Sequence, residues 1–94
     1  MGSTMLALPA ELTLKGATAT LRTLEPAIAA EPGPVITLDA SALKQIDSSA
    51  LAVLLQCRRQ AEARQASFQV INAPCRLTEL AQLYGLQDLL ELKA

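Results

Sequence analysis

Residues 35–59 join a short apolar segment to a long apolar segment through a polar connection, and this pattern limits the possible folds most. Residues 35–39 are mostly apolar and β-branched, which favours a strand covered on at least one face. Residues 48–64 carry apolar side chains at helical spacing and predict the longest helix of the chain. A strand followed by such a helix is typical of an open sheet with helices packed on it.

The N-terminal third adds two extended segments and one helix. Residues 5–9 and 11–14 alternate apolar and other side chains, which predicts an N-terminal hairpin that ends at Gly16. Apolar spacing predicts a helix over residues 18–30 that is broken or kinked near Pro26.

The C-terminal third continues the alternation of strands and helices. Residues 67–72 predict a second strand like the one over 35–39. The next helix places four side chains on one stripe, and Gly85 ends it with a left-handed cap; the stripe is Leu77, Leu80, Ala81 and Tyr84. Residues 86–93 form a helical turn or an edge strand.

The core is expected to consist of aliphatic side chains, because the chain has one Phe, one Tyr and no Trp. Leu43 and Ile46 anchor the connection between strand and long helix. The helix over 48–64 is expected to bury one stripe and to expose a charged side; the buried stripe is Leu51, Leu54, Leu55 and Ala61, and the exposed side is Arg58, Arg59, Glu62 and Arg64.

The length of 94 residues fits one domain, assigned to residues 5–94. Residues 1–4 are expected to be an expression remnant, with Met5 as the native start. The fold class predicted from the order of elements is α/β, with a small mixed β-sheet and helices packed on it.

Charge and composition exclude two classes of partner. The net charge is −1 and aromatic residues make up 2% of the chain, so neither a basic surface nor a base-stacking platform for nucleic acid is expected. No apolar run approaches the roughly 20 residues of a membrane-spanning helix, so direct membrane insertion is not expected. Cys57 and Cys75 are interpreted as free thiols in a reducing cytoplasm.

An enzymatic function is not expected. The chain has no His, so a serine or cysteine nucleophile lacks its usual base, and an ordinary zinc site lacks a frequent ligand. Lys44 near Ser48 suggests a Ser–Lys pair, but no glycine-rich oxyanion loop accompanies it. We therefore predict no catalytic residue, no metal and no cofactor.

Asp47, Ser48 and Ser49 open the long helix and have two open interpretations. They form a helix cap, in which side-chain oxygens accept the free N–H groups of the first turn. They also form a docking site at the carboxyl edge of the sheet, where a phosphate on Ser48 would be tolerated by the helix dipole and would disturb a partner. Asp39 is either a turn residue or an accessory ligand that binds a cation together with Asp47.

Residues 35–39 and 46–55 resemble the STAS domain family, which includes anti-sigma-factor antagonists and the C-terminal part of sulfate transporters. The motif of that family is an apolar strand ending in Asp, then Asp-Ser/Thr-Ser/Gly-Gly-Leu and an apolar helix. Here the corresponding residues are Asp39 and the run from Asp47 to Leu51, with Ala50 where the family often has Gly. The resemblance covers almost the whole chain and implies a STAS fold.

Residues 80–90 are most similar to the stand-alone STAS subunit of the bacterial phospholipid ABC transporter that maintains outer-membrane lipid asymmetry, the MlaB-like group. This resemblance implies a non-enzymatic cytoplasmic subunit that docks on the transporter ATPase, and through it on the permease, peripheral to the inner membrane. The implied partner-contacting residues are Asp47, Ser48, Ser49, Ala50 and Leu51, with Asp39 and Lys44 as accessory candidates.

The alternative within the same family is an anti-sigma-factor antagonist. In that case an anti-sigma kinase would be the partner, and Ser48 would be the residue it phosphorylates. Ala50 in place of Gly is expected to stiffen the start of the helix or to keep the partner further away.

Overall fold

The computed structural model describes residues 5–31 and 33–93, so the expectation for residues 1–4 lies outside the described residues. The observed order of strands and helices agrees with the predicted alternation, apart from one additional short strand, β4. The elements are β1 (Met5–Ala7), β2 (Glu11–Leu12), α1 (Ala17–Ala30), β3 (Val35–Asp39), β4 (Gln45–Ile46), α2 (Ser49–Ala63), β5 (Ser67–Ile71), α3 (Cys75–Leu83) and α4 (Gln87–Leu90).

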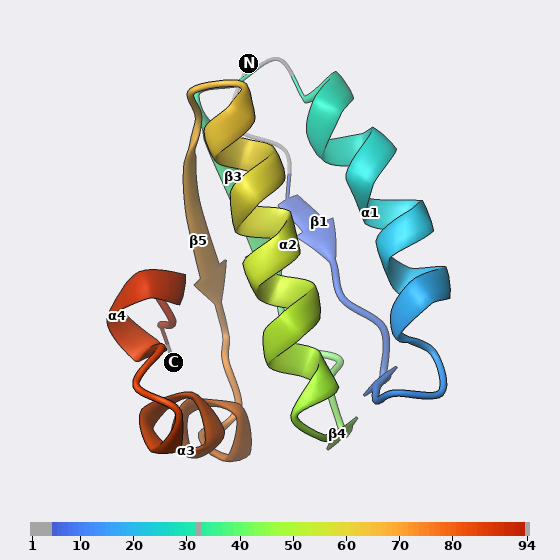
Figure 1. Ribbon diagram of the computed structural model, residues 1–94, viewed down its shortest axis with the longest axis vertical. Coiled ribbons are helices and arrows are strands. Elements are labelled where there is room, and N and C mark those ends of the chain that lie inside the picture. Colours follow the sequence, from blue (N-terminus) through green and yellow to red (C-terminus); the bar gives the residue numbers. More distant parts are fainter. Residues whose placement is uncertain (1–4, 32, 94) are drawn as a thin grey trace.

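A three-stranded sheet in the order β1-β3-β5 forms the centre of the molecule (Figure 1). Leu38 of β3 lies between Leu6 of β1 and Val70 of β5, and both pairings are parallel. A second, two-stranded sheet pairs β2 with β4, again in parallel. The α/β fold class is confirmed, and the ladders between the described strands are parallel where a mixed sheet was expected.

The predicted N-terminal hairpin is wrong. β1 and β2 follow one another along the chain, but each pairs with a strand more distant in sequence. The Leu8 N–H donates to the Asp39 carbonyl at 2.9 Å, and the Lys44 N–H donates to the Ala10 carbonyl at 2.7 Å. Alternating side chains indicate a strand but do not specify its neighbour, so the sequence pattern was equally compatible with both pairings.

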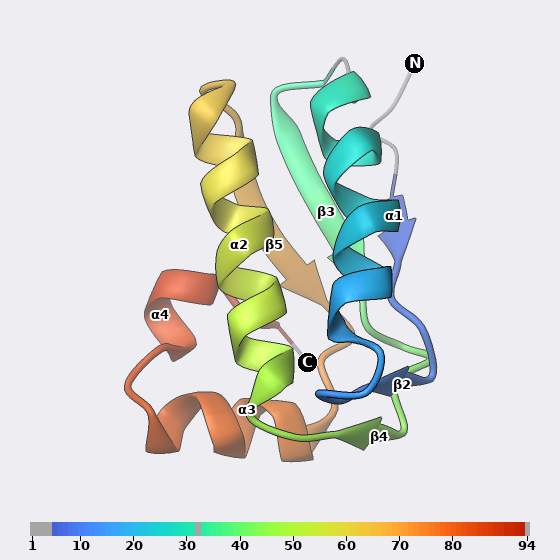
Figure 2. The same ribbon diagram turned by 45° about the vertical axis from the view of Figure 1, so that its right-hand side comes forward.

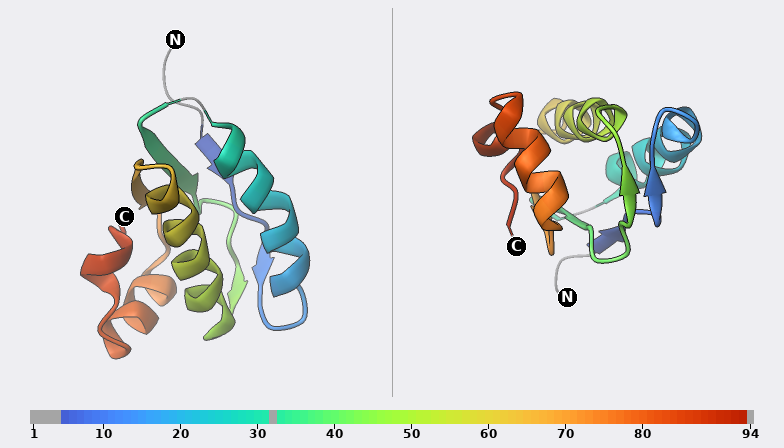
Figure 3. Two further views of the ribbon diagram at one scale, coloured as in Figure 1. Left: turned by 45° about the horizontal axis from the view of Figure 1, so that its top comes forward. Right: turned by 90° about the horizontal axis from the view of Figure 1, so that it is seen from below.

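Helices α1 and α2 lie side by side over one face of the sheet (Figures 2 and 3). In the central strand β3, the alternate side chains Ile36 and Leu38 point to this face. They are buried together with Phe68 and Val70 of β5. The predicted core residues Leu43, Ile46, Leu51, Leu54 and Ala61 are also buried, whereas Leu55 is half-buried. α2 buries three more side chains that the predicted stripe omitted, namely Ala50, Val53 and Cys57.

Helix α1 runs unbroken through Pro26, so the predicted break is absent. Pro26 lies on the exposed side, where the carbonyl that loses its helical partner can bind water. Arg64, expected on the solvent side of α2, is half-buried and turns toward the end of α1. Its Nη2 donates to the Glu31 carbonyl and, at 2.9 Å, to the Gly33 carbonyl, which joins the ends of the two helices.

The C-terminal part confirms the cap at Gly85, which has φ of 70°. Both forms considered for residues 86–93 occur, since α4 is followed by a parallel bridge between Leu92 and Val70. Tyr84, by contrast, is 56% exposed and does not belong to the buried stripe of α3. None of the helices described is long and apolar enough to span a membrane.

Candidate functional site

The start of α2 lies at the end of the molecule to which the carboxyl ends of β3 and β5 point (Figure 1). β4 leads directly into α2, and α3 lies at the same end. The sequence therefore predicted correctly that the Asp47-Ser48-Ser49 segment follows the sheet at its carboxyl edge.

Asp47 caps helix α2. Its Oδ1 accepts the Ser49 N–H at 2.8 Å, and its backbone carbonyl accepts the Ala50 N–H at 2.9 Å. Ser49 is the first residue of α2, and an oxygen that accepts its N–H satisfies one of the N–H groups that the first turn leaves free. The helix-cap interpretation therefore holds for the side chain of Asp47, whereas Ser48, at the N-cap position, makes no side-chain cap hydrogen bond.

The other oxygen of Asp47 binds a distant segment. Oδ2 accepts the Leu14 N–H at 3.0 Å, which ties the loop after β2 to the start of α2. This Leu14 N–H is the largest cause that lowers the pKa of Asp47 below its usual value, and the Ser49 N–H acts in the same direction. The carboxylate is thus ionised at neutral pH and fixed at both oxygens.

Ser48 is exposed, and its hydroxyl has no hydrogen-bond partner within residues 5–31 and 33–93. Ser49 is half-buried. A phosphate or a partner group can therefore reach Ser48 without breaking a contact of the fold. Lys44 is exposed as well, and no described contact joins its amine to Ser48.

Ala50 and Leu51 do not lie on the accessible part of this site. Ala50 is 0% exposed and Leu51 is buried, so both belong to the core beneath the first turn. The Ala50 methyl group, expected to hold a partner away, points inward and leaves the surface unchanged.

Asp39 has a separate set of partners. Its Oδ1 accepts the Asn72 amide N–H and the Ser41 N–H, both at 3.0 Å. The Asn72 amide is the largest cause that lowers the pKa of Asp39, followed by the Ser41 N–H. Asp39 thereby connects the ends of β3 and β5. No cluster of three or more potential metal ligands occurs in the described residues, and a shared cation site with Asp47 has no geometric support.

Two exposed leucines flank Asp47 and were missed by the sequence analysis. Leu14, which donates its N–H to Asp47, has a side chain that is 77% exposed. Leu83 of α3 is 78% exposed and lines a shallow hollow of about 400 Å³ together with Ile46 and Asp47. We call the surface formed by Leu14, Asp47, Ser48, Ser49 and Leu83 the docking patch. Leu83 falls outside the apolar stripe of its helix, and this was the only sequence signal for its exposure.

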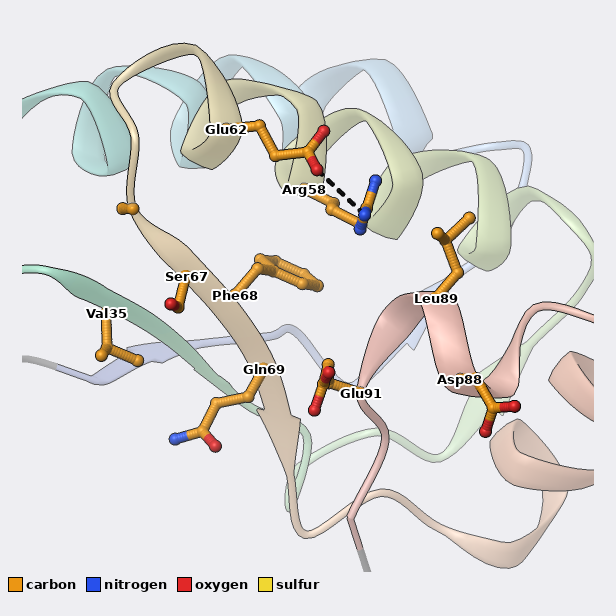
Figure 4. Close-up of a pocket in the computed structure, with 10 residues that line it drawn as sticks. Val35, Arg58, Glu62, Ser67, Phe68, Gln69, Asp88, Leu89 and Glu91 are labelled. Carbon is orange, nitrogen blue, oxygen red and sulfur yellow. Dashed lines mark ion pairs between the residues drawn. The ribbon is translucent and has the colours of Figure 1, made fainter.

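A larger hollow than the one beside Asp47, of about 580 Å³, lies elsewhere, between β5, α2 and α4 (Figure 4). The Arg58–Glu62 ion pair, at 2.9 Å, borders it, and Phe68 and Leu89 line it. It contains none of the residues of the docking patch. Its one cation, Arg58, is already paired with Glu62.

Comparison with known proteins identifies the family. The family described as "Mlab, STAS domain" matches residues 2–91. No curated protein matches the sequence.

Three solved structures share the fold at low sequence identity. The anti-sigma factor antagonist SpoIIAA in its unphosphorylated form is 21% identical, with a TM-score of 0.76 over 96% of this chain and 77% of that one. A STAS domain protein from Planctomyces limnophilus is 15% identical, with a TM-score of 0.82 over 98% and 82%. A sulfate transporter family protein from Wolinella succinogenes is 16% identical, with a TM-score of 0.75 over 95% and 74%.

Proposed function

The chain belongs to the STAS domain family of the MlaB type, and on that premise we propose that it is a non-enzymatic subunit of a phospholipid ABC transporter. As a single domain over residues 5–94, it docks on the transporter ATPase in the cytoplasm and supports the assembly and activity of the complex. It is peripheral to the inner membrane through this partner. The MlaB-type family match over residues 2–91 is the observation that carries the proposal.

The docking patch has the features of a protein-binding surface. Leu14 and Leu83 present apolar side chains to solvent, and each lies close to Asp47, next to the exposed Ser48. Exposed apolar side chains that a partner can cover are typical of the centre of a protein interface, which is more apolar than its rim. Asp47 is fixed by two hydrogen bonds, so little side-chain entropy is lost when a partner covers the patch.

A catalytic role for the same residues has no support. The chain contains no His, and no described contact gives the Ser48 hydroxyl a base. The N–H groups that Asp47 and Asp39 accept lower the pKa of each carboxyl group, which makes both of them weak bases. The patch therefore suits recognition and not chemistry.

The experiment is a binding measurement between the purified chain and the ATPase of the phospholipid ABC transporter from the same organism. Ser48→Glu places a bulky anion in the centre of the patch and should weaken the affinity by at least about tenfold. The fold should remain intact, because a negative charge near a helix N-terminus is favourable. Circular dichroism and thermal melting check the fold of each variant.

Ser67→Glu is the matched control, because Ser67 is an exposed serine at the start of β5, away from the patch. It should bind like the unmodified protein. Equal affinities for the Ser48→Glu and Ser67→Glu variants would exclude the patch as the docking surface. No binding by the unmodified chain would exclude this ATPase as the partner.

An anti-sigma-factor antagonist is the second candidate function. The exposed Ser48 hydroxyl at the start of a helix is open to a kinase, and the fold is shared with SpoIIAA, whose structure is described as the unphosphorylated form. Incubation with a cognate kinase and ATP, followed by mass spectrometry, tests it. Phosphate on Ser48 supports this candidate, and an unmodified chain removes it.

A further inference from the structure

The outer edge of β1 has unpaired backbone groups. In a parallel ladder, alternate residues direct their N–H and C=O groups to opposite sides of the strand. The Leu8 N–H donates to the Asp39 carbonyl, so Leu6 and Leu8 face β3, and Met5 and Ala7 face outward. Apart from the ladder to β3, the backbone groups of Met5 and Ala7 make no hydrogen bond to another residue within 5–31 and 33–93.

The opposite edge of the sheet, formed by β5, is partly covered by another segment of the chain. Val70 of β5 donates its N–H to the Glu91 carbonyl at 3.2 Å and accepts the Lys93 N–H at 2.8 Å. The segment after α4 therefore covers much of this edge. Soluble proteins usually protect an open edge strand by keeping it short, or with charged residues, proline or a covering segment. β1 is short, with Met5, Leu6 and Ala7, but it contains no charged residue and no proline.

The helix beside β1 is unusually poor in charge. The exposed residues of α1 are Thr18, Ala19, Arg22, Thr23, Pro26, Ala29 and Ala30, among which Arg22 alone is charged. The other charged residue of α1, Glu25, turns inward and accepts hydrogen bonds from Gln56 and Gln60 of α2. A mostly apolar groove of about 430 Å³ runs between this helix and β1, and Leu8, Ala19 and Thr23 line it.

We propose that a second copy of this chain pairs with β1, antiparallel and about a twofold axis at Leu6, so that two sheets join into one. In this register, Met5 of each copy lies opposite Ala7 of the other, and both residues exchange their N–H and C=O groups. No other antiparallel register lets both outward-facing residues of each strand make these bonds. The mostly apolar groove and the charge-poor surface of α1 then lie beside the junction, where a buried charge would be costly.

The short edge predicts a weak dimer, so self-association should depend on concentration. Sedimentation velocity over roughly a hundredfold range of concentration should show a monomer–dimer equilibrium. Met5→Lys, at a side chain that is 54% exposed, places a charge at the junction and should give a monomer. Leu89→Lys, at an exposed residue of α4, is the matched control and should associate like the unmodified chain.

A disulfide tests the register. Two Leu6 residues facing across the axis form a pair without hydrogen bonds, with Cα atoms about 4.5 Å apart, which suits a disulfide. Leu6→Cys in a Cys75→Ser background should therefore form a covalent dimer on mild oxidation. Leu89→Cys in the same background should not, and buried Cys57 is common to both.

A monomer at every concentration would overturn the proposal and leave the edge to a strand from a different protein. Self-association that Met5→Lys does not change would overturn it as well. Both results are independent of ATPase binding, because no residue of the docking patch is altered.

Discussion

Asp47 connects two parts of the chain at the residue scale, with one carboxylate oxygen for each. One oxygen caps α2 through the Ser49 N–H, and the other holds the Leu14 N–H. The cap could be predicted from the sequence, because Asp followed by two serines before an apolar helix is a local pattern. The Leu14 contact could not be predicted, because it joins residues 33 positions apart.

Asp47→Asn should remove one of these two contacts and keep the other. An amide oxygen can still cap the helix, but the amide nitrogen cannot accept the Leu14 N–H. The folded-state pKa of Asp47 lies below the usual 3.8, so its ionised form stabilises the fold above that pH. The variant should therefore melt at a lower temperature at pH 7, and the difference should shrink as the pH falls below about 4.

Thermal melts of both proteins between neutral pH and pH 3 check this prediction. Asp88→Asn is the control, because its exposed side chain makes no hydrogen bond to a described residue. A difference that stays constant with pH would show that the Asp47 charge does not stabilise the fold.

The two cysteines should differ sharply in reactivity. Burial in the core, followed by the charge of Glu25, raises the pKa of Cys57 to about 12, whereas Cys75 is exposed. A neutral, buried thiol reacts slowly, so a maleimide should label Cys75 alone in the folded protein. Mass spectrometry should find one label on the folded chain, two in denaturant, and none on folded Cys75→Ser. Rapid labelling of folded Cys57 would contradict its placement in the core.

For single strands and helices, local sequence patterns predicted the type and the bounds of each element but not which strands pair with one another. β3, α2 and β5 begin and end within a residue or so of the predicted limits. The strands β1 and β2 were recognised as extended, but the hairpin was wrong, because their parallel partners lie about 30 residues further along the chain. β4 was missed, because two residues carry too little periodicity to recognise.

Pro26 lies inside α1, where it removes one helical hydrogen bond without ending the helix. Pro26→Ala should restore this bond and make the protein more stable by about 1–3 kcal/mol, because proline is disfavoured in helix interiors. Urea unfolding curves measure the change. Thr18→Ala, also exposed on α1, should shift stability by less than about 0.5 kcal/mol. A less stable Pro26→Ala variant would show that proline is favoured here.

At the scale of the whole molecule, aliphatic composition and alternating elements predicted an α/β fold with α1 and α2 on the sheet. The sequence also located the Asp47-Ser48-Ser49 segment at the carboxyl edge of the sheet. It did not predict which apolar side chains stay exposed, because exposure depends on how the elements pack together. Leu14, Leu83 and Tyr84 are exposed for this reason, and Ala50 and Leu51, assigned to the site, are buried.

Hydrogen exchange of the chain with and without the transporter ATPase tests docking through Ser48 most directly. Docking there predicts added protection at residues 46–52 and 79–84 and around Leu14, which together form and surround the docking patch. The outer edge of β1 and the exposed side of α1 should exchange at similar rates in both samples. Protection confined to β1 and α1, or no protection, would contradict docking through Ser48 and its neighbours.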